Sequence, residues 1–166
     1  MNKIERWIYN KVRYNQKIKK KLVYIYQVIF SSLTKNDSIA PYPIVVREGF
    51  FFGFHDKIPW SPDNTKLLAH RYTKPLMFPK PSESVDVGYF TGKKFTNFKR
   101  IGDTNTWNWQ MGSMLQWLGN SNKIIFNDWD GSKHVARIFD TNGTEEDRIS
   151  NPVAAVDQSG KFAISL

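Results

Sequence analysis

Three stretches of the chain alternate between short apolar runs and tight polar turns in the same order. They lie at residues 58–69, 114–126 and 153–164. In each, an apolar run leads into a turn rich in Asn, Asp, Ser or Gly, and a second apolar run follows a lysine. This pattern is typical of a β-hairpin, and its recurrence indicates an internal structural repeat.

The spacing of this repeat favours a propeller. Counted between Lys66, Lys123 and Lys161, the intervals are 57 and 38 residues, and a four-stranded propeller blade takes roughly 40 to 50. The longer interval contains residues 73–84, whose three prolines favour an inserted loop.

Two further strands are expected between successive hairpins. We therefore predict an all-β fold, a β-propeller fragment of two whole blades and the first hairpin of a third, which the end of the chain cuts short. The blades are expected at about residues 49–106 and 107–150, with the third from residue 151. The additional strands are expected at residues 85–90, 95–101, 134–140 and 144–149.

A helical period precedes the repeat. Apolar residues recur at intervals of mostly three or four, and no Gly or Pro occurs before Pro41. We therefore predict an amphipathic helical arm over residues 1–35 and a linker over residues 36–48. The apolar positions of the arm are Ile4, Ile8, Val12, Ile18, Leu22, Ile25, Ile29 and Leu33.

Basic charge is concentrated in this arm. Residues 1–35 carry nine Lys or Arg and one acid, Glu5, in a chain whose net charge is +9. The remainder is nearly neutral and lacks the basic face that a nucleic-acid-binding domain needs, so no nucleic-acid partner is expected. The chain has no cysteine, which excludes a disulfide framework and a thiolate metal site.

Three interpretations of the arm stay open. It is a basic helix on an anionic membrane surface, with Trp7, Tyr14, Tyr24 and Tyr26 at the interface; a helix packed on the propeller or on a partner; or a signal peptide cleaved after residues 38–40. The apolar run from Leu22 to Leu33 is too short to span a bilayer.

Several segments carry a family resemblance. Residues 61–68, Ser-Pro-Asp-Asn-Thr-Lys-Leu-Leu, resemble the hairpin of TolB-like and WD40-like propellers. Residues 52–61 and 107–112 are similar to propeller proteins encoded with bacterial surface-polysaccharide genes and, more distantly, to oligogalacturonate lyase propellers. This resemblance implies a glycan or sugar-containing precursor as partner, a role in polysaccharide biosynthesis, and a location in the cytoplasm, either free or peripheral on the inner membrane.

One end of the predicted blades collects most of the reactive side chains. Strand direction alternates, so the segments that enter each first strand and leave each second strand share one rim. Trp faces suit sugar rings, and amide, carboxylate and guanidinium groups bind hydroxyls. The rim residues are His55, Asp56, His70, Arg71, Trp107, Trp109, Gln110, Asn127, Asp128 and Asp130.

Each residue on this rim has a functional and a structural interpretation. For a lyase that acts on an acidic sugar, the candidate catalytic residues are His55, His70 and Arg71. The histidines are equally suited to structural hydrogen bonds. The candidate ligand-binding residues are Asp56, Trp107, Trp109, Gln110, Asn127 and Asp128, although Trp107 and Trp109 would also suit packing between blades. Trp60 and Trp117 occupy equivalent positions on inner strands and are expected in the core.

The sequence offers few candidate residues for a metal or cofactor site. Two histidines, His55 and His70, would parallel the metal ligands of the lyase propellers that the sequence resembles, but no third ligand is identifiable, so no metal is predicted. Residues 128–131 begin like a calcium loop without its later Glu, which favours a plain turn. No cofactor is assigned. Three functions stay open: carbohydrate binding or processing, a lyase or glycosyltransferase-associated enzyme, and a non-catalytic scaffold.

Overall fold

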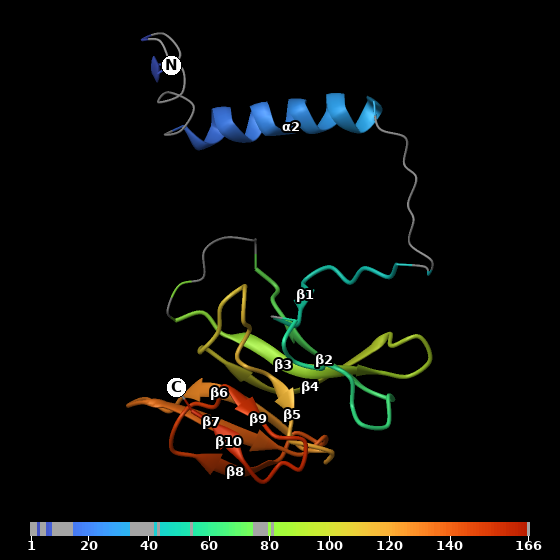
Figure 1. Cartoon of the computed structure of the whole chain (residues 1–166), viewed down its shortest axis with the longest axis vertical. Coiled ribbons are helices and arrows are strands. Elements are labelled where there is room, and N and C mark those ends of the chain that lie inside the picture. The colour runs from blue at the N-terminus through green and yellow to red at the C-terminus, as the bar shows by residue number, and fades with distance from the viewer. Residues whose placement is uncertain are drawn as a thin grey trace. The chain divides into compact units, whose positions relative to one another are not determined.

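The computed structural model describes residues 3, 6, 7, 15–33, 42, 44–53, 55–74, 80 and 82–165. The chain divides into two compact units, residues 1–45 and 46–166, which we describe separately. The first unit contains a helix and the second contains antiparallel sheets (Figure 1). The described residues are therefore mostly β with an N-terminal helix, as the sequence predicts at this coarser level.

Helix α2 spans Gln16–Leu33. It begins at Asn15, whose Oδ1 accepts a hydrogen bond from the Ile18 amide at 3.2 Å and so caps the helix. Within the residues that the structure describes, no helix combines the length and the apolar character needed to cross a bilayer. Tyr14 and the expected cleavage site at residues 38–40 lie outside the described residues.

The second unit contains two four-stranded sheets and one hairpin. In both sheets each strand pairs with its neighbour in the sequence, so the strand order follows the chain. The first sheet contains β1 (Phe50–Phe51), β2 (Leu67–Arg71), β3 (Val85–Thr91) and β4 (Asn97–Thr104). The second contains β5 (Gln116–Trp117), β6 (Ile124–Trp129), β7 (His134–Phe139) and β8 (Glu145–Ile149), and the hairpin is β9 (Ala155–Val156) with β10 (Ala163–Ile164).

The three predicted hairpins share one hydrogen-bonding pattern. In each, the residue that follows a bridged position donates its amide to the carbonyl that closes the turn, at 2.8–3.0 Å. The bridged pairs are Trp60 with Leu67, Trp117 with Ile124, and Val156 with Ala163. The closing carbonyls belong to Lys66, Lys123 and Phe162.

The structure corrects the alignment of the third hairpin by one residue. Phe162, not Lys161, is the equivalent of Lys66 and Lys123. The reason is the Asp157 side chain, whose Oδ1 accepts the Phe162 amide at 2.8 Å and fixes the turn around that position. Aligning the lysines by type therefore misplaced the backbone register.

The first strand of the first sheet also differs from expectation. Only Trp60 of the expected strand pairs with β2, through an isolated bridge to Leu67. The regular pairing comes from β1, where Phe50 faces Arg71 and Phe51 faces His70. Of the expected loop at residues 73–84, positions 75–79 and 81, which include its three prolines, lie outside the described residues.

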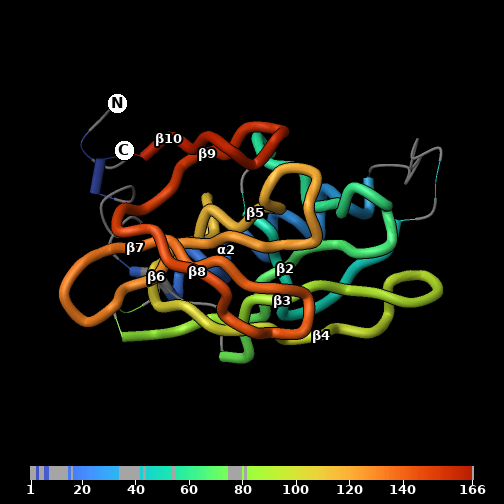
Figure 2. The backbone as a smooth tube through the Cα atoms, turned by 90° about the horizontal axis from the view of Figure 1, so that it is seen from below, coloured from blue at the N-terminus to red at the C-terminus, as the bar shows by residue number. Residues whose placement is uncertain are grey.

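Strand β6 of the second sheet is buried on both faces. Ile124 and Phe126 of β6 pack with Leu68 and Val87 of the first sheet. Ile125, which points to the other face because side chains alternate along a strand, packs with Val153 ahead of β9. The sheets and the hairpin therefore pack face to face in series, with the β9–β10 hairpin beside β5 (Figure 2).

Candidate functional site

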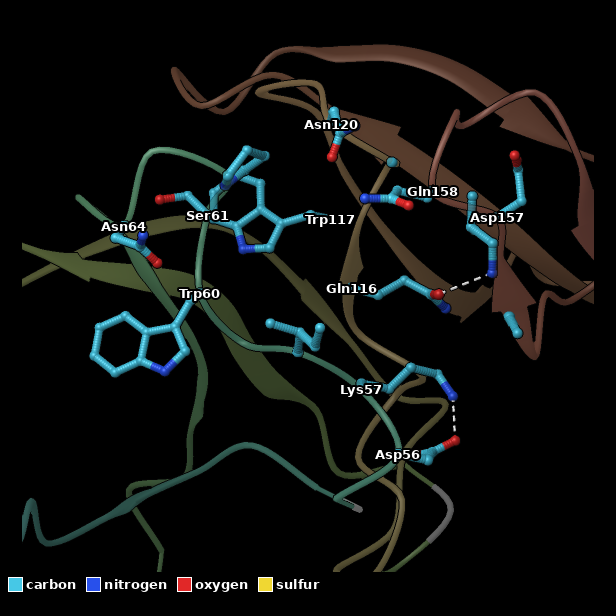
Figure 3. A pocket seen from close by; sticks show the side chains of 15 residues that line it. Asp56, Lys57, Trp60, Ser61, Asn64, Gln116, Trp117, Asn120, Asp157 and Gln158 are labelled. Carbon is cyan, nitrogen blue, oxygen red and sulfur yellow. Dashed lines mark hydrogen bonds and ion pairs between the residues drawn. The ribbon is translucent and has the colours of Figure 1, made fainter.

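A cleft of about 660 Å³ lies where the turns and inner strands of the three hairpins meet (Figure 3). Each hairpin supplies part of its wall, so residues about a hundred positions apart line one hollow. The lining residues are Asp56, Lys57, Ile58, Trp60, Ser61, Pro62, Asn64, Gln116, Trp117, Gly119, Asn120, Ala155, Val156, Asp157 and Gln158.

The two tryptophans in this wall differ in exposure. Trp117 is 7% exposed, belongs to the core between the sheets, and donates Nε1–H to the Pro59 carbonyl at 3.0 Å. Trp60 is 41% exposed and its ring packs edge-on against Phe95. The expectation of a core position is therefore confirmed for Trp117 and wrong for Trp60, which pairs with β2 through an isolated bridge and keeps its indole partly exposed.

Four amide side chains line the cleft. Asn64, Asn120 and Gln158 are exposed, and each comes from the turn of a different hairpin. Gln116 is buried and structural: its Nε2 donates to the Met114 carbonyl and its Oε1 accepts the Val156 amide, both at 3.0 Å. This bond from β9 to the Gln116 side chain joins the third hairpin to the second sheet.

The ionic groups in the cleft are already paired or hydrogen-bonded. Lys57 forms an ion pair with Asp56, and its hydrogen bond lowers the pKa of that carboxyl. Hydrogen bonds from the Ser159 side chain and from the Phe162 amide lower the pKa of Asp157 to about 2. Both carboxyls are thus ionised at neutral pH, and neither is poised to donate a proton.

Among the predicted rim residues, His70 and Asn127 occupy equivalent positions of β2 and β6 and connect adjacent sheets. The Ser113 amide donates to His70 Nε2 at 3.2 Å, and Ser113 Oγ lies 2.8 Å from the same nitrogen. Asn127 donates Nδ2–H to the Val153 carbonyl at 3.0 Å and accepts the Val153 amide at 2.8 Å. Both side chains hold the chain that enters the next sheet.

The environment of His70 does not suit a catalytic base that contacts substrate. Its side chain is completely buried, stacks on Phe51, and lies against Gly112, where an added Cβ would approach His70 Cε1 to 2.5 Å. Burial lowers the pKa of His70 to about 4, and the neighbouring backbone of Phe51 and Phe52 opposes that shift only in part. The ring is therefore neutral above pH 5 and holds Ser113 as a structural acceptor.

Arg71 and Asp128 follow these two positions and lie in ion-pair chains. Arg71 donates to Asp86 at 2.8 and 3.0 Å, and Arg100 binds the other oxygen of the same carboxylate at 2.7 Å. Burial works to raise the pKa of Asp86, but hydrogen bonds from the two arginines outweigh it and hold that pKa below its ordinary value. Asp128 accepts Arg137 Nη1 at 2.8 Å.

Trp107 and Trp109 belong to an aromatic cluster that also includes Phe51 and Tyr72. Their two rings meet edge-to-face with centroids 5.0 Å apart, and each contacts Phe51 and Tyr72 within 5.7 Å. Trp107 also donates Nε1–H to the Glu83 carbonyl at 2.6 Å. The structure thus brings these two predicted residues together, and their rings pack on one another.

Glu83 organises the edge of this cluster and was not anticipated from the sequence. It is buried, accepts a hydrogen bond from the Lys80 amide and another from the Tyr72 hydroxyl, and lies 3.7 Å from Lys74 Nζ. These contacts, with the Lys80 amide first among them, lower the pKa of Glu83 although burial opposes the shift. Its position beside a proline-rich stretch had only indicated a loop.

The remaining predicted residues do not form one constellation. His55, Asp56 and Gln110 are exposed, and among the predicted site residues only Asp56 lines the cleft. His70 and Arg71 are adjacent on β2 and point to opposite faces, so the three candidate catalytic side chains do not converge. Within the described ranges, no group of three or more His, Asp or Glu side chains is arranged to hold a metal ion.

The residues that line the cleft are spread over three separate stretches of the sequence. The turns of all three hairpins carry amide or carboxylate side chains, which turn formation alone explains equally well. Only the packing of the hairpins shows that these turns meet. Comparison of the chain with protein-family models, curated proteins and solved structures finds no match.

Proposed function

We propose that residues 46–165 form successive blades of a β-propeller and that the cleft along their inner strands binds a neutral carbohydrate. The propeller is supported by three hairpins with one hydrogen-bonding pattern and by face-to-face packing in chain order. In a propeller the innermost strands face a common axis, and β5, β9 and Trp60 are the elements that line the cleft.

The observation that carries the binding proposal is the combination of an exposed indole with amides from three turns. The apolar face of a sugar ring stacks on an aromatic ring, and side-chain amides both donate to and accept from hydroxyls. Trp60 supplies the ring, and Asn64, Asn120 and Gln158 supply the amides. A cleft of this size accommodates a small oligosaccharide.

The charges in the cleft favour a neutral sugar over an acidic one. Lys57 is the single basic residue in the wall and is already paired with Asp56, while Asp157 adds a second carboxylate. An incoming sugar carboxylate would meet this negative charge without an available cation. A lyase on acidic sugars receives correspondingly less support. We extend the proposal to bacterial surface polysaccharide on the resemblance of residues 52–61 and 107–112 alone.

The test is binding of the intact chain to an array of neutral and acidic glycans, followed by titration calorimetry on the best ligand. Trp60→Ala removes the stacking surface and should weaken binding about fivefold, since aromatic contacts of this kind contribute about 1 kcal/mol. Trp129→Ala is the matched control, because Trp129 is also 41% exposed but does not line the cleft.

Two results would contradict the proposal. One is a preference for acidic glycans, which the carboxylates of the cleft oppose. The other is equal weakening by both tryptophan variants, which would place the ligand elsewhere. If the chain bound no glycan but captured a protein stoichiometrically, the scaffold interpretation would replace it.

A further inference from the structure

Helix α2 presents one continuous apolar face to the solvent. Its aliphatic residues recur every three or four positions, which places them in a single stripe, and Tyr26 and Phe30 flank that stripe with rings 4.3 Å apart. All the members are at least 40% exposed. The stripe is formed by Ile18, Leu22, Ile25, Ile29 and Leu33.

The N-terminal end of the same helix is strongly basic. Lys17, Lys19, Lys20 and Lys21 lie in its first turn and a half, and the helix contains no Asp or Glu. Positive charge at a helix N-terminus opposes the helix dipole, which favours anions there. The lysines and the helix dipole therefore concentrate positive charge at this end of α2, and contact with an anionic surface would reduce the resulting repulsion.

We propose that α2 docks on the surface of an anionic lipid bilayer, with its apolar stripe in the acyl–headgroup boundary and its lysines against lipid phosphates. A helix with one apolar face and a basic polar side adopts this orientation. α2 does not meet the requirements for a membrane-spanning helix. The proposal concerns the first unit and does not depend on glycan binding by the second.

Two features favour a bilayer over a protein groove as the occupant. By helical geometry Lys19 and Lys21 lie at the two margins of the apolar stripe; lysines there can extend their ammonium groups to the headgroups, whereas a protein groove would have to bury or pair them. Tyr26 and Phe30 are also exposed beside the stripe, and aromatic side chains at its margin suit the interface between lipid and water.

The first test is cosedimentation of the intact chain with vesicles. We expect binding to vesicles of phosphatidylcholine with roughly 30% phosphatidylglycerol, an anionic density that attracts basic segments. Binding to vesicles of pure phosphatidylcholine should be weak. Replacing Lys17, Lys19, Lys20 and Lys21 by Gln should lower the partition coefficient by on the order of a thousandfold at low salt. Equal sedimentation with both kinds of vesicle, or none with either, would overturn the proposal.

A matched pair of charge variants tests the orientation. Ile29→Glu places a carboxylate on the apolar stripe, and Gln27→Glu places the same charge on the opposite side of the helix. Losing the burial of Ile29 should weaken vesicle binding by on the order of thirtyfold, with a clearly smaller loss for Gln27→Glu. Equal losses would show that charge alone drives binding and that the stripe does not enter the bilayer.

The absence of native cysteine allows a direct readout of that orientation. Ile25→Cys and Gln27→Cys, each carrying an environment-sensitive fluorophore, report on the two sides of α2. Vesicles should shift the emission of the Ile25 label to the blue and leave the Gln27 label nearly unchanged. A shift of the Ile25 label without vesicles, and no further change on adding them, would assign the stripe to a protein contact instead.

Discussion

His70 and Asn127 lie at two successive junctions of the second unit, where the chain leaves one sheet and enters the next. Both hold the entering segment, but with different chemistry. Each is a polar side chain of the second strand of its sheet that holds the segment entering the next sheet. Asn127 makes a two-bond contact with the Val153 backbone, at 2.8 and 3.0 Å, using a group that carries no charge at any ordinary pH. His70 depends on a ring nitrogen that protonation would convert from acceptor to donor.

Two equivalent positions of the repeat can thus share one geometry and still respond differently to pH. The first junction is sensitive to acid and the second is not. Because both sheets pack through one continuous series of cores, loss of the first junction should weaken the whole second unit. The predictions below separate the two junctions, from the largest effect to the smallest.

The largest effect is expected at the first junction from Gly112→Ala. Gly112 has φ +60°, and an added Cβ would lie 2.5 Å from His70 Cε1 and 2.7 Å from the Phe52 carbonyl. Left-handed backbone strain and displacement of the Phe52 backbone together should lower the free energy of unfolding by about 4 kcal/mol. Urea denaturation followed by circular dichroism measures it; a loss below 1 kcal/mol would show that the His70 ring relaxes freely.

At the second junction, Asn127→Ala should lower the free energy of unfolding by about 3 kcal/mol. The change leaves the amide and carbonyl of Val153, which is buried, without their partners. The same denaturation measurement at pH 7 and pH 5 should give the same loss. A loss that grows at pH 5 would contradict the assignment of pH sensitivity to the other junction.

Acid should destabilise the protein through His70. A folded pKa of about 4 against an unfolded value of 6.5 means that the unfolded chain binds the proton more tightly. Stability from this group is full above pH 6.5, falls as pH drops, and is reduced by about 2 kcal/mol at pH 5. His70→Asn, which installs the residue of the second junction, should flatten the stability profile between pH 6.5 and 5; an unchanged slope would refute the role of His70.

The smallest effects are expected from the ion pairs that follow each junction. Arg137 is 21% exposed and joins Asp128 to Glu145, whereas Arg71 is 38% exposed and pairs with Asp86. Arg137→Gln should lower the free energy of unfolding by about 1–2 kcal/mol, and Arg71→Gln by less than about 1 kcal/mol, since Asp86 keeps Arg100. Thermal melts in low and high salt measure both, and a larger effect of Arg71→Gln would reverse this ranking.

The strands were predictable because their pattern is local. β3, β7 and β8 begin and end within one residue of the expected ranges, since turn signals on both sides bound them. The register of the third hairpin was not predictable, because a carboxylate contact from Asp157, rather than a lysine, fixes that turn. Similarly, β1 was missed because its two residues pair only with the end of β2.

The burial of His70 and Asn127 was not predictable from the sequence, for a physical reason. His70 and Asn127 lie next to ionisable residues at strand ends, and the sequence does not show that a further sheet covers them. In a strand buried on both faces, the polar side chains lie between sheets. Residue type alone therefore does not distinguish a side chain that holds two sheets together from one that contacts a ligand. Trp60 was misassigned in the opposite sense, because its equivalence to Trp117 concealed the gap in the first inner strand.

The walls of the cleft belong to three separate sheets, and this has a mechanical consequence. Side-chain bonds such as Trp117 to Pro59 and Gln116 to Val156 tie these walls together. A ligand that bridges all three turns would add further links between these sheets. Occupancy should therefore slow amide hydrogen exchange in all three turns at once.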